Sequence, residues 1–465
     1  MSKYVLKCYK SRMGYYVYDR FSNAVFKVSE EEFNNFLNLE NGTDHADPEF
    51  LSKYQSEGAF VCNGVEEIEH PQSPYVEYYL SKKLSHLSLQ VTQQCNLRCK
   101  YCAYSGLYYN RTHNSKYMTW DTAKKAIDFY LERTSEMERL HMSFYGGEPL
   151  LNFNLIKTCV EYISAQVEAK RLTFSMTTNA TLLTEEVRSF LHEHDFQLSI
   201  SLDGDREEHD KNRTFANGTG SFDTVIKNIK SLVAEYPDYA KKVTFLPVIS
   251  PNTDLDRVLK FFSTEPFISE CAVTYNTMSE TGLKNEIAYS KNYMLIRRFE
   301  YLRLLFHLLG KIDEKSISPM VLPVKEEFKK MIMALHDHSS IKKCSHHGGP
   351  CMPGVKRLFV SYDGTFYPCE KVSETNPDNS IGNISQGFDQ QKVKNMLNIG
   401  QITKEECINC WNLRFCSICI GRINDPSRDQ NQTKVEKLKA CALEKSNTMN
   451  FLYEISVLQE LGKDL

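Results

Sequence analysis

Alternating apolar and polar positions mark the first part of the chain. The runs Tyr4–Tyr9, Tyr15–Asp19 and Ala24–Val28 predict three short strands. Ser29 is followed by three glutamates, which predicts a helix start, because a serine caps free backbone amides and acidic side chains favour a helix N-terminus. Residues 1–80 are therefore predicted to form a small winged unit of strands followed by helices, either a structural cap or a peptide-binding module.

Strand and helix patterns then alternate from about residue 84 to about residue 275. Repeated strand–helix units are typical of a parallel sheet with right-handed crossovers. About six strands suit an α/β fold of the partial (β/α)6 TIM-like barrel type, with functional side chains at the C-terminal strand ends. The predicted strands are Leu84–Thr92, His141–Tyr145, Leu172–Thr177, Leu198–Leu202 and Val243–Ile249, and the predicted helices are Trp120–Glu136, Leu155–Ala169, Glu185–His194 and Phe222–Glu235.

The last third of the chain changes in character. A mostly helical pattern gives way at Cys344 to cysteine-rich loops, and a final helix is predicted from Thr433 to the end. Four parts are therefore expected: a unit over 1–80, a core over 84–282, a helical linker over 283–343 and a cysteine-rich domain over 344–465.

Composition narrows the function classes. The chain has 465 residues and a net charge of −3, with Lys and Arg dispersed, which argues against a nucleic-acid partner. No apolar run reaches the roughly 18 residues that span a bilayer, and the start of the chain does not resemble a signal peptide, so a cytoplasmic protein without a membrane partner is expected. Fifteen cysteines in tight local groups predict metal ligands rather than disulfides.

The first cysteine group is a single short loop. Cys95, Cys99 and Cys102 follow the first barrel strand with C-x3-C-x2-C spacing. Three thiolates can hold three irons of a cubane [4Fe–4S] cluster and leave the fourth iron open to a ligand. A zinc loop that lacks its fourth ligand is the alternative, which is disfavoured because structural zinc sites need a closed tetrahedral set.

This spacing, with Tyr101 as the aromatic residue before the third cysteine, resembles the signature of the radical SAM superfamily, which uses S-adenosylmethionine (SAM). The resemblance covers the chain from about residue 84 to the end. It implies that the turn after the second barrel strand holds the methionine amino group of SAM, where Tyr145 replaces a frequent Gln. Glycines allow close backbone approach, and a carboxylate can accept from an ammonium group. The residues of this turn are Gly146, Gly147, Glu148 and Pro149.

Polar residues at the following strand ends extend the resemblance. It implies that Asn179 lines the site and that Ser201 contacts the ribose or methionine portion of SAM. Arg213 is the candidate for the SAM carboxylate, since a guanidinium pairs well with a carboxylate. A structural salt bridge remains the alternative for Arg213, and turn formation remains the alternative for Asn179 and Asp203.

A second cysteine group resembles the SPASM extension of radical SAM peptide maturases. Its eight thiolates would complete two [4Fe–4S] clusters, although only two residues separate Cys416 from Cys419, where three are usual. Two zinc sites are the alternative. The resemblance implies a first auxiliary cluster on Cys344, Cys351, Cys369 and Cys419, and a second on Cys407, Cys410, Cys416 and Cys441. The remaining cysteines, predicted to be buried small hydrophobes, are Cys8, Cys62, Cys159 and Cys271.

The resemblance also implies the chemistry. SAM and three [4Fe–4S] clusters would generate a 5′-deoxyadenosyl radical that abstracts hydrogen from the substrate, with electrons from a reductant such as flavodoxin or ferredoxin. With eight cysteines present, fully ligated auxiliary clusters that transfer electrons are expected. Residues 1–80 resemble a leader-recognition domain that would capture a precursor peptide by β-augmentation.

Three functions follow. The first is a maturase that forms thioether cross-links, of sactipeptide or ranthipeptide type, in a ribosomally synthesised precursor peptide. The second is an anaerobic sulfatase-maturing enzyme that generates formylglycine. The third is a non-enzymatic iron–sulfur electron carrier or redox sensor, which the Gly146–Pro149 turn disfavours because a carrier needs no SAM pocket.

Overall fold

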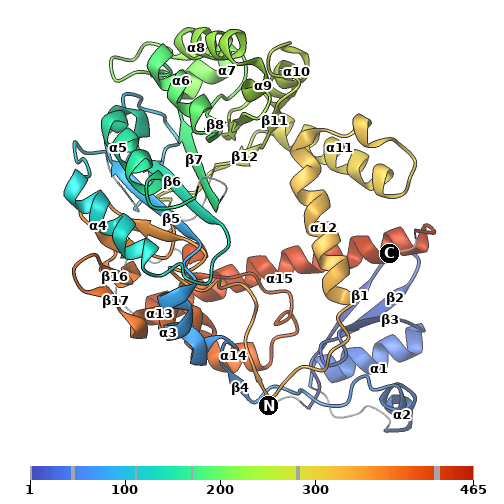
Figure 1. Ribbon diagram of the computed structural model, residues 1–465. Coiled ribbons are helices and arrows are strands. Elements are labelled where there is room, and N and C mark those ends of the chain that lie inside the picture. The colour runs from blue at the N-terminus through green and yellow to red at the C-terminus, as the bar shows by residue number, and fades with distance from the viewer. Residues whose placement is uncertain are drawn as a thin grey trace.

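A ten-stranded sheet organises the molecule (Figure 1). The computed structural model describes residues 3–42, 48–109, 111, 113–168, 171–278, 283–423 and 430–463. The strand order is β11-β9-β8-β7-β6-β5-β14-β15-β16-β17, and neighbours from β11 to β14 pair in parallel. The fold is thus α/β with a large, mostly parallel sheet, as predicted. The first six parallel strands are β5 (His86–Thr92), β6 (Leu140–Gly146), β7 (Leu172–Thr178), β8 (Gln197–Ile200), β9 (Thr244–Phe245) and β11 (Ala272–Val273).

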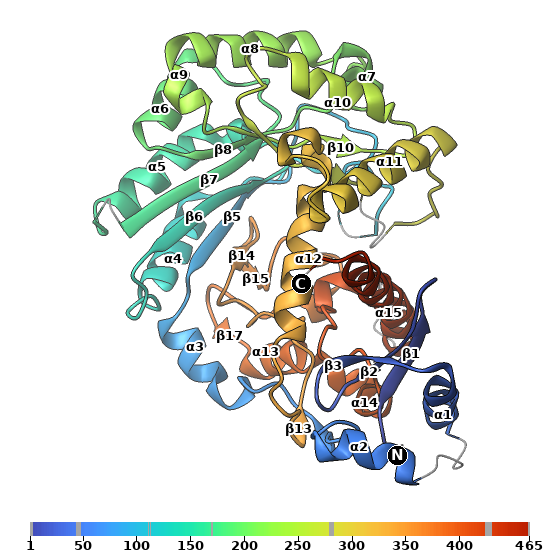
Figure 2. The same cartoon turned by 90° about the vertical axis from the view of Figure 1, so that its right-hand side faces the viewer.

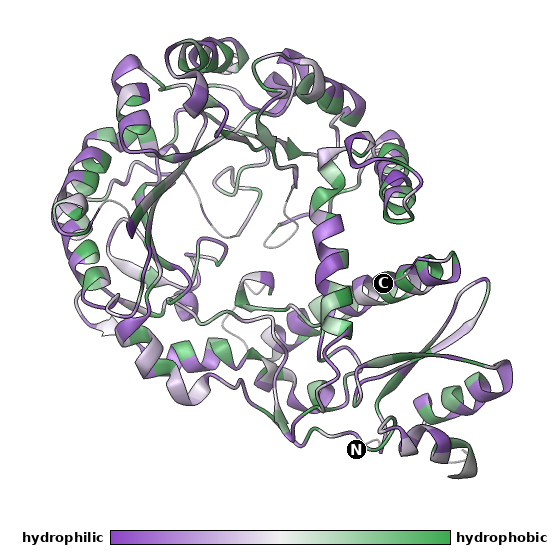
Figure 3. Ribbon diagram, turned by 45° about the vertical axis from the view of Figure 1, so that its right-hand side comes forward, coloured by the Kyte–Doolittle hydropathy of each residue, from purple (hydrophilic) through white to green (hydrophobic). Residues whose placement is uncertain are grey.

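Helices cover the outer face of these strands (Figures 1 and 2). Several of these helices begin at a capping residue; Thr119 and Thr184, for example, accept hydrogen bonds from backbone amides in the first turns of α4 and α6. In Figure 3 these helices carry both hydrophilic and hydrophobic residues, as amphipathic helices with one face on a sheet do. They are α4 (Trp120–Leu131), α5 (Phe153–Ser164), α6 (Glu185–Glu193), α7 (Arg206–Asn212), α8 (Phe222–Glu235), α9 (Pro237–Ala240) and α10 (Leu255–Thr264).

Apolar and polar side chains alternate along the first barrel strands, so the apolar core lies on one face of the sheet and polar side chains lie on the other. In β5, Leu87 and Leu89 belong to the main buried apolar cluster, and so do Met142 and Phe144 of β6. Successive side chains of a strand point to opposite faces. The polar residues between them, Ser88 and Ser143, therefore lie on the other face of the sheet.

One predicted strand is wrong. The run Val243–Ile249 is divided into β9 and β10 (Val248–Ile249), and β10 pairs with β12 (Asn276–Thr277) in a separate two-stranded sheet. Pro247 lies between them and has no N–H to donate to a continuous ladder. Two predicted helices also end early, α4 at Leu131 and α5 at Ser164, while Ala169 lies outside the described residues.

The cysteine-rich part continues the barrel sheet. Strand β14 (Leu358–Val360) pairs in parallel with β5, on the side opposite β6. Antiparallel strands then complete the sheet: β15 (Thr365–Tyr367), β16 (Gly382–Asn383) and β17 (Gly387–Phe388). The helices of this part are α13 (Gln390–Leu397), α14 (Lys404–Ile408) and α15 (Gln430–Glu460). The first and second cysteine groups are therefore joined by one sheet.

The N-terminal unit is an antiparallel sheet in the order β1-β2-β3, followed by helices. Ser29 and Glu32 form a reciprocal capping box at the start of the first helix. Phe36 and Phe60 are fully buried in a separate apolar core. The elements are β1 (Leu6–Lys10), β2 (Tyr15–Asp19), β3 (Ala24–Val28), α1 (Glu30–Glu40) and α2 (Pro48–Ser56).

This unit docks on the C-terminal end of α15 (Figure 1). The Tyr9 hydroxyl lies 2.9 Å from the Ser456 hydroxyl, and the Tyr16 hydroxyl donates to a Glu460 carboxylate oxygen at 2.6 Å. Further along the chain, β4 (Glu67–Ile68) pairs in parallel with β13 (Cys344–Ser345). The N-terminal unit and the cysteine-rich part are therefore packed together.

Two long helices fill the predicted linker, α11 (Lys291–Leu308) and α12 (Leu322–Leu335), and α3 (Val76–Lys82) leads into the barrel. None of the described helices has the length and apolarity that crossing a bilayer requires. Of the remaining cysteines, Cys8 and Cys159 are buried as predicted and Cys271 is half-buried. The prediction is wrong for Cys62, which is exposed on a segment without helix or strand structure. The short 3-10 turns are Ser73–Tyr75, Pro149–Asn152, Glu314–Ser316, Pro319–Val321, Pro377–Asn379, Ile399–Thr403 and Ile420–Arg422.

Candidate active site

The first cysteine loop begins at the C-terminal end of β5 and packs against the turn that ends β6. The Gly147 amide donates to the Thr92 carbonyl at 3.0 Å, and the next amide along donates to the Gln94 carbonyl at 2.9 Å. A Cβ on Gly146 would overlap the Thr92 carbonyl oxygen, and one on Gly147 would overlap the Gln94 carbonyl oxygen. Glycine is needed here because the two backbones touch, so the turn fixes the loop that carries Cys95.

Glu148 faces inward from this turn. Its carboxylate accepts hydrogen bonds from the Thr178 hydroxyl at 2.7 Å and the Asn179 amide at 2.7 Å, both at the end of β7. It also accepts from the Leu150 amide at 3.1 Å. Burial raises the pKa of Glu148 to about 7. The carboxylate that the sequence suggested for a ligand ammonium therefore ties β6 to β7, and Pro149 is buried at the start of the following 3-10 turn.

Asn179 continues from this contact to the cysteine loop. Its side-chain amide donates to the Asn96 side chain at 2.9 Å and lies 3.8 Å from the Cys95 sulfur. Ser201 lies at the end of the adjacent strand, where its amide donates to the Thr178 carbonyl at 3.0 Å. Both predicted residues therefore stand at C-terminal strand ends, as expected for a barrel site.

Tyr101, Asp203 and Arg213 form one buried cluster. The Tyr101 hydroxyl donates to an Asp203 carboxylate oxygen, and the Arg213 Nε lies 3.0 Å from the other oxygen. The guanidinium lies 5.4 Å from the centre of the Tyr101 ring, and its Nη1 lies 3.9 Å from the Cys99 sulfur. The backbone amide of Val248 also donates to Asp203, at 3.1 Å. Sequence reasoning missed this role of Asp203, because a turn-forming aspartate and a buried ion-pair partner have the same sequence signal.

The three thiols of the loop are shielded from water. Burial raises the pKa of Cys95 to about 12 and of Cys99 to about 11, and it also raises the pKa of Cys102. The thiols raise one another's pKa values further, whereas Arg213 lowers that of Cys99. Several buried thiolates at one point need positive charge to balance them. This donor set fits a cationic iron–sulfur cluster, held by the loop between β5 and α4.

The second group separates into two neighbourhoods. Burial raises the pKa of Cys369 to about 11, and Cys419 and Cys351 raise it further. Burial likewise raises the pKa of Cys416 to about 12, with further contributions from Cys410 and Cys441. Cys407 contributes to the raised pKa of Cys441. The thiols that influence one another are those that the resemblance assigned to each auxiliary cluster, apart from Cys344.

Cys344 stands in a different environment. It is exposed on β13, which pairs with β4. Partial burial, followed by Glu69 and Glu67, raises its pKa. Negative charges beside a thiol favour its protonated form. A contribution of Cys344 to the first auxiliary cluster therefore remains a prediction.

A buried cation joins the two cysteine regions. The Arg111 Nε pairs with a Glu374 carboxylate oxygen at 2.6 Å, and its Nη1 donates to the Tyr145 hydroxyl at 3.2 Å. Gln90 and Gln93 donate to the same carboxylate at 2.9 Å. Sequence reasoning missed this network, since nothing local links Arg111 to a glutamate 263 positions later. It connects the end of β5 to the loop after Cys369.

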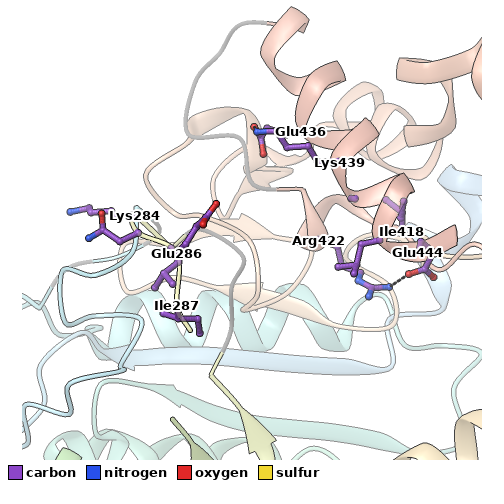
Figure 4. A pocket seen from close by; sticks show the side chains of 12 residues that line it. Lys284, Glu286, Ile287, Ile418, Arg422, Glu436, Lys439 and Glu444 are labelled. Carbon is purple, nitrogen blue, oxygen red and sulfur yellow. Dashed lines mark hydrogen bonds and ion pairs between the residues drawn. The ribbon is translucent and has the colours of Figure 1, made fainter. Parts of the chain in front are cut away.

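A pocket of about 580 Å³ opens beside both cysteine regions (Figure 4). Lys284, Glu286 and Ile287 lie on one side, and residues of the C-terminal part lie on the other. The Lys284 amide donates to the Leu107 carbonyl at 2.9 Å, which ties this side to the first cysteine loop region. The opposite side consists of Ile418, Arg422, Glu436, Lys439, Ala440, Leu443 and Glu444, with an Arg422–Glu444 ion pair at 3.0 Å. Its size is typical of ligand pockets.

Comparisons with known proteins relate the chain to the radical SAM superfamily. The family model of the radical SAM superfamily matches residues 89–262, which include the first cysteine loop. A cysteine-type anaerobic sulfatase-maturating enzyme of Clostridium novyi is 27% identical over 74% of this chain and 90% of its own length. The radical SAM cyclopropyl synthase TigE of Paramaledivibacter caminithermalis is 24% identical over 89% of this chain and 81% of its own length.

A shorter match and a solved structure complete the comparison. An uncharacterised protein of Methanocaldococcus jannaschii, MJ0907, is 39% identical to part of this chain. The match covers 30% of this chain and 45% of that protein. The structure of native anSMEcpe with bound AdoMet shares the fold, with a TM-score of 0.56 and 21% identity over 80% of this chain and 99% of that one. The same protein with AdoMet and the Cp18Cys peptide matches at a TM-score of 0.51 and 20% identity, over 78% of this chain and 99% of that one.

Proposed function

We propose, from the premise that this chain is a radical SAM enzyme, that it modifies a ribosomally synthesised precursor peptide by forming thioether cross-links from cysteine to another residue. The observation that carries the proposal is the position of α15. Ser456 and Glu460 at one end of the helix hold the N-terminal sheet, and Ala440 and Leu443 toward the other end line the pocket beside the cysteine groups. Peptide recognition and peptide chemistry would thus share one rigid element.

The N-terminal sheet offers an edge for a leader peptide. Within the described residues β3 pairs only with β2. Three of its five residues are half-buried and one is exposed, whereas three of the five residues of β1 are buried. An open strand edge binds an extended peptide through main-chain hydrogen bonds. We therefore assign leader binding to β3.

The length of α15 sets the spacing in the precursor. Ala440 and Ser456 are separated by about 24 Å along the helix axis, at about 1.5 Å per residue. An extended peptide rises about 3.3 Å per residue. A precursor that engages both ends then needs about seven or more residues between its leader contact and its first modified residue.

The residues of the first site fit the cofactors. Cys95, Cys99 and Cys102 would hold the cluster, and the backbone of Gly146 and Gly147 would bind SAM, with Tyr101, Glu148, Pro149, Asn179, Ser201 and Arg213 around it. When bound, these cofactors supply a 5′-deoxyadenosyl radical that removes a hydrogen atom from a substrate carbon. Asp203 holds the Arg213 guanidinium close to Cys99, where its charge favours the thiolate form.

The second group would hold two further clusters, giving three in all. Lys437 supports this assignment for Cys407, because its buried side-chain nitrogen lies 3.6 Å from that sulfur. Such clusters would accept an electron from the substrate during cross-linking. Forming a thioether from a thiol and a C–H bond removes two hydrogen atoms, so an electron acceptor is required.

Formylglycine formation is the second candidate. The match to the Clostridium novyi enzyme over 90% of its length favours it. The solved anSMEcpe structure lacks a counterpart for about a fifth of this chain, however, since it covers 80% of it. The additional length, together with the strand edge of the N-terminal unit, supports a substrate with a separate leader.

Mass spectrometry separates the two candidates. The chain is co-expressed anaerobically with each short open reading frame that flanks its gene. Thioether formation should lower the peptide mass by two hydrogens per link and protect the cysteine from iodoacetamide. Loss of sulfur with a hydrazide-reactive aldehyde would instead support formylglycine formation. The triple variant Cys95→Ala, Cys99→Ala, Cys102→Ala is the control; a peptide that it still modifies would contradict the assignment of the first site.

A further inference from the structure

His347 is a buried histidine whose ring has no hydrogen-bond partner. Only 1% of the residue is exposed, and neither ring nitrogen meets a donor or an acceptor among the described residues. Buried polar groups almost always have a partner, because leaving one unpaired is costly. The ring of His347 is therefore expected to meet a bound group.

The neighbouring His346 differs, because both of its ring nitrogens are engaged. Its Nε2 accepts from the Gly400 amide at 2.8 Å, and its Nδ1 lies 2.7 Å from the His347 carbonyl oxygen. Since Nε2 accepts, the proton lies on Nδ1, which donates to the carbonyl. The centres of the two histidine rings lie 4.2 Å apart. One ring of the pair is thus fixed by the protein, and the other keeps both nitrogens available to a ligand.

The segment that carries His347 packs on the loop that carries Cys419. A Cβ on Gly349 would overlap the Ile418 carbonyl oxygen, so the two backbones touch. Gly349 is two residues from both His347 and Cys351, and Ile418 directly precedes Cys419. Two residues span at most about 7 Å. The histidine and two cysteines of the first auxiliary group therefore start from one backbone contact.

Cys369 reaches the same loop along a second segment. A Cβ on Gly421 would lie 3.8 Å from the Cys419 sulfur and 3.4 Å from the Lys371 Cβ. Lys371 is two residues after Cys369. Three of the four cysteines assigned to the first auxiliary cluster thus converge on one loop, where they can hold three irons of a cubane.

Cys344, the fourth cysteine of that assignment, is held in a different place. It is exposed on β13, and the backbone on both sides of it is bonded to the segment of β4. The Lys343 carbonyl accepts from the Glu67 amide at 3.0 Å, and the Ser345 carbonyl accepts from the Glu69 amide at 3.1 Å. The two glutamates beside the thiol disfavour its thiolate form. The converging cysteines therefore leave a place for another ligand.

We propose that His347 is the fourth ligand of the first auxiliary cluster, in place of Cys344. The inference rests on the proposed function, which supplies the cluster, and changes one of its ligands. A neutral imidazole gives the lone pair of one ring nitrogen to iron and keeps its proton on the other nitrogen. Histidine in place of cysteine raises the reduction potential of an iron–sulfur cluster. This cluster would then be the better electron acceptor of the two auxiliary clusters.

Two other partners suit His347 less well. The second auxiliary cluster already has a full set of four cysteines, so it offers no iron to a fifth ligand. Three cysteines and one histidine can also hold a zinc ion, which needs its ligands gathered around one point. Among the described residues, however, no three Cys, His, Asp or Glu side chains form a site for a single metal ion. A larger cluster therefore fits this donor set better.

Iron content and nitrogen hyperfine coupling test this ligand on the full-length chain. The triple variant of the first cysteine loop serves as the background, because after anaerobic reconstitution it should hold only the auxiliary clusters, with about eight irons per chain. Pulsed EPR of the reduced protein, with unlabelled and with isotopically labelled histidine, should show a strong coupling to a histidine nitrogen. His347→Gln should abolish this coupling and lower the iron to about four atoms per chain.

Three further substitutions in this background complete the test. Cys344→Ser should keep both the iron and the coupling. His346→Gln is the matched control and should also keep both, since a glutamine oxygen can still accept from the Gly400 amide. His347→Cys should restore about eight irons, lose the coupling and lower the reduction potential of one cluster, because a thiolate carries a negative charge that an imidazole lacks.

Several results would overturn the proposal. Loss of about four irons in Cys344→Ser, with full iron in His347→Gln, returns the ligand position to the thiol. Full iron without a histidine coupling shows that the ring does not bind iron. Equal losses in His346→Gln and His347→Gln show damage to the fold, and zinc in place of iron removes the cluster from the site.

The proposed function is tested separately, by mass spectrometry of the precursor peptide. A chain that forms thioethers but shows no histidine coupling keeps the proposed function and loses this ligand. A chain that shows the coupling but forms no thioether keeps the ligand and loses the proposed function.

Discussion

Single residues set the tightest constraint where β6 ends against the first cysteine loop. Gly146 has a φ of +147° and leaves no room for a Cβ beside the Thr92 carbonyl. Gly146→Ala should therefore destabilise the protein by about 2–4 kcal/mol, from the unfavourable φ and the overpacking together. A lower thermal midpoint and a lower iron content per chain are expected, because the strained turn carries the loop with Cys95.

Gly218 provides the matched control. It also has a positive φ, +85°, but a Cβ there would meet nothing within 4 Å. Gly218→Ala should cost only about 1–2 kcal/mol and leave the iron content unchanged. Equal effects of the two substitutions would show that backbone conformation alone, and not the close contact with the cysteine loop, explains the first result.

Sequence reasoning at this scale succeeds for motifs and fails for orientation. The cysteines of the first loop lie close together in sequence, and so do the residues of the glycine turn, so each motif can be recognised from its own spacing. The inward direction of the Glu148 carboxylate depends on the end of β7, and the ion pair of Asp203 depends on Arg213, ten residues later. Such contacts arise only when strand ends converge.

Among the elements, the first two barrel strands carry a pair of neighbouring histidines. The rings of His86 on β5 and His141 on β6 lie 4.4 Å apart. The His86 Nε2 lies 2.7 Å from the Ser143 hydroxyl, and Arg357 donates to its Nδ1 at 3.3 Å. Burial, and then His141 and Arg357, lower the pKa of His86 to about 3. A ring that accepts a hydrogen bond from a guanidinium must be neutral.

Stability should therefore fall in acid. Below about pH 6.5 the unfolded histidine binds a proton that the folded one does not bind until about pH 3. The contribution of neutral His86 to the free energy of unfolding is complete above about pH 6.5. It is lost as the pH falls, at no more than about 1.4 kcal/mol per pH unit. His86→Gln should flatten the decline of the thermal midpoint between about pH 6.5 and pH 5. The control His338→Gln changes an exposed histidine and should leave the decline of the thermal midpoint as it is. A decline that His86→Gln does not change would show that His86 is not the cause of the acid sensitivity.

Element boundaries follow local chemistry where the sequence states it. Ser29 caps its helix as expected, and α4 begins at Trp120 as predicted, with Thr119 as its cap. Pro247 also signals the division of the strand, because proline has no N–H to donate to a ladder. The apolar residues on both sides of it, however, favour one continuous strand. The exposed apolar residues of α11, among them Phe299, show the limit of periodicity, since their spacing predicts a buried face at a place where the helix is exposed.

Over the whole molecule, Arg20 links the N-terminal unit to the second cysteine group. It is fully buried, and its guanidinium donates to the carbonyls of Ile408 at 2.7 Å and Cys410 at 3.0 Å. Arg20→Met should leave these acceptors unsatisfied, at about 1–3 kcal/mol each. Iron should fall by about four of about twelve atoms per chain, since one of three proposed cubane clusters loses its support.

Arg12→Met is the matched control, because Arg12 is exposed on the hairpin of the same unit. Iron and thermal midpoint should stay at the values of the unchanged chain. An Arg20→Met protein with full iron content would show that the N-terminal unit does not support the second cysteine group.

The arrangement of the parts was beyond the reach of sequence reasoning. Patterns along the chain predicted a winged unit, a barrel and cysteine-rich loops, but not that β14 pairs with β5 or that the N-terminal unit rests on α15. These contacts join segments hundreds of residues apart, and no local pattern records them. They depend on which open strand edges and helix ends remain after the nearby elements have packed.

The pairing of β14 with β5 has a consequence for synthesis. About 270 residues separate the two strands, so a ribosome adding about 5–20 residues per second needs roughly 14–54 s to supply the partner of β5. During that time the nascent chain presents an unprotected strand beside its first cysteine loop, and unpaired edges invite aggregation. The yield of folded protein is then expected to depend on how well this edge is shielded while translation proceeds.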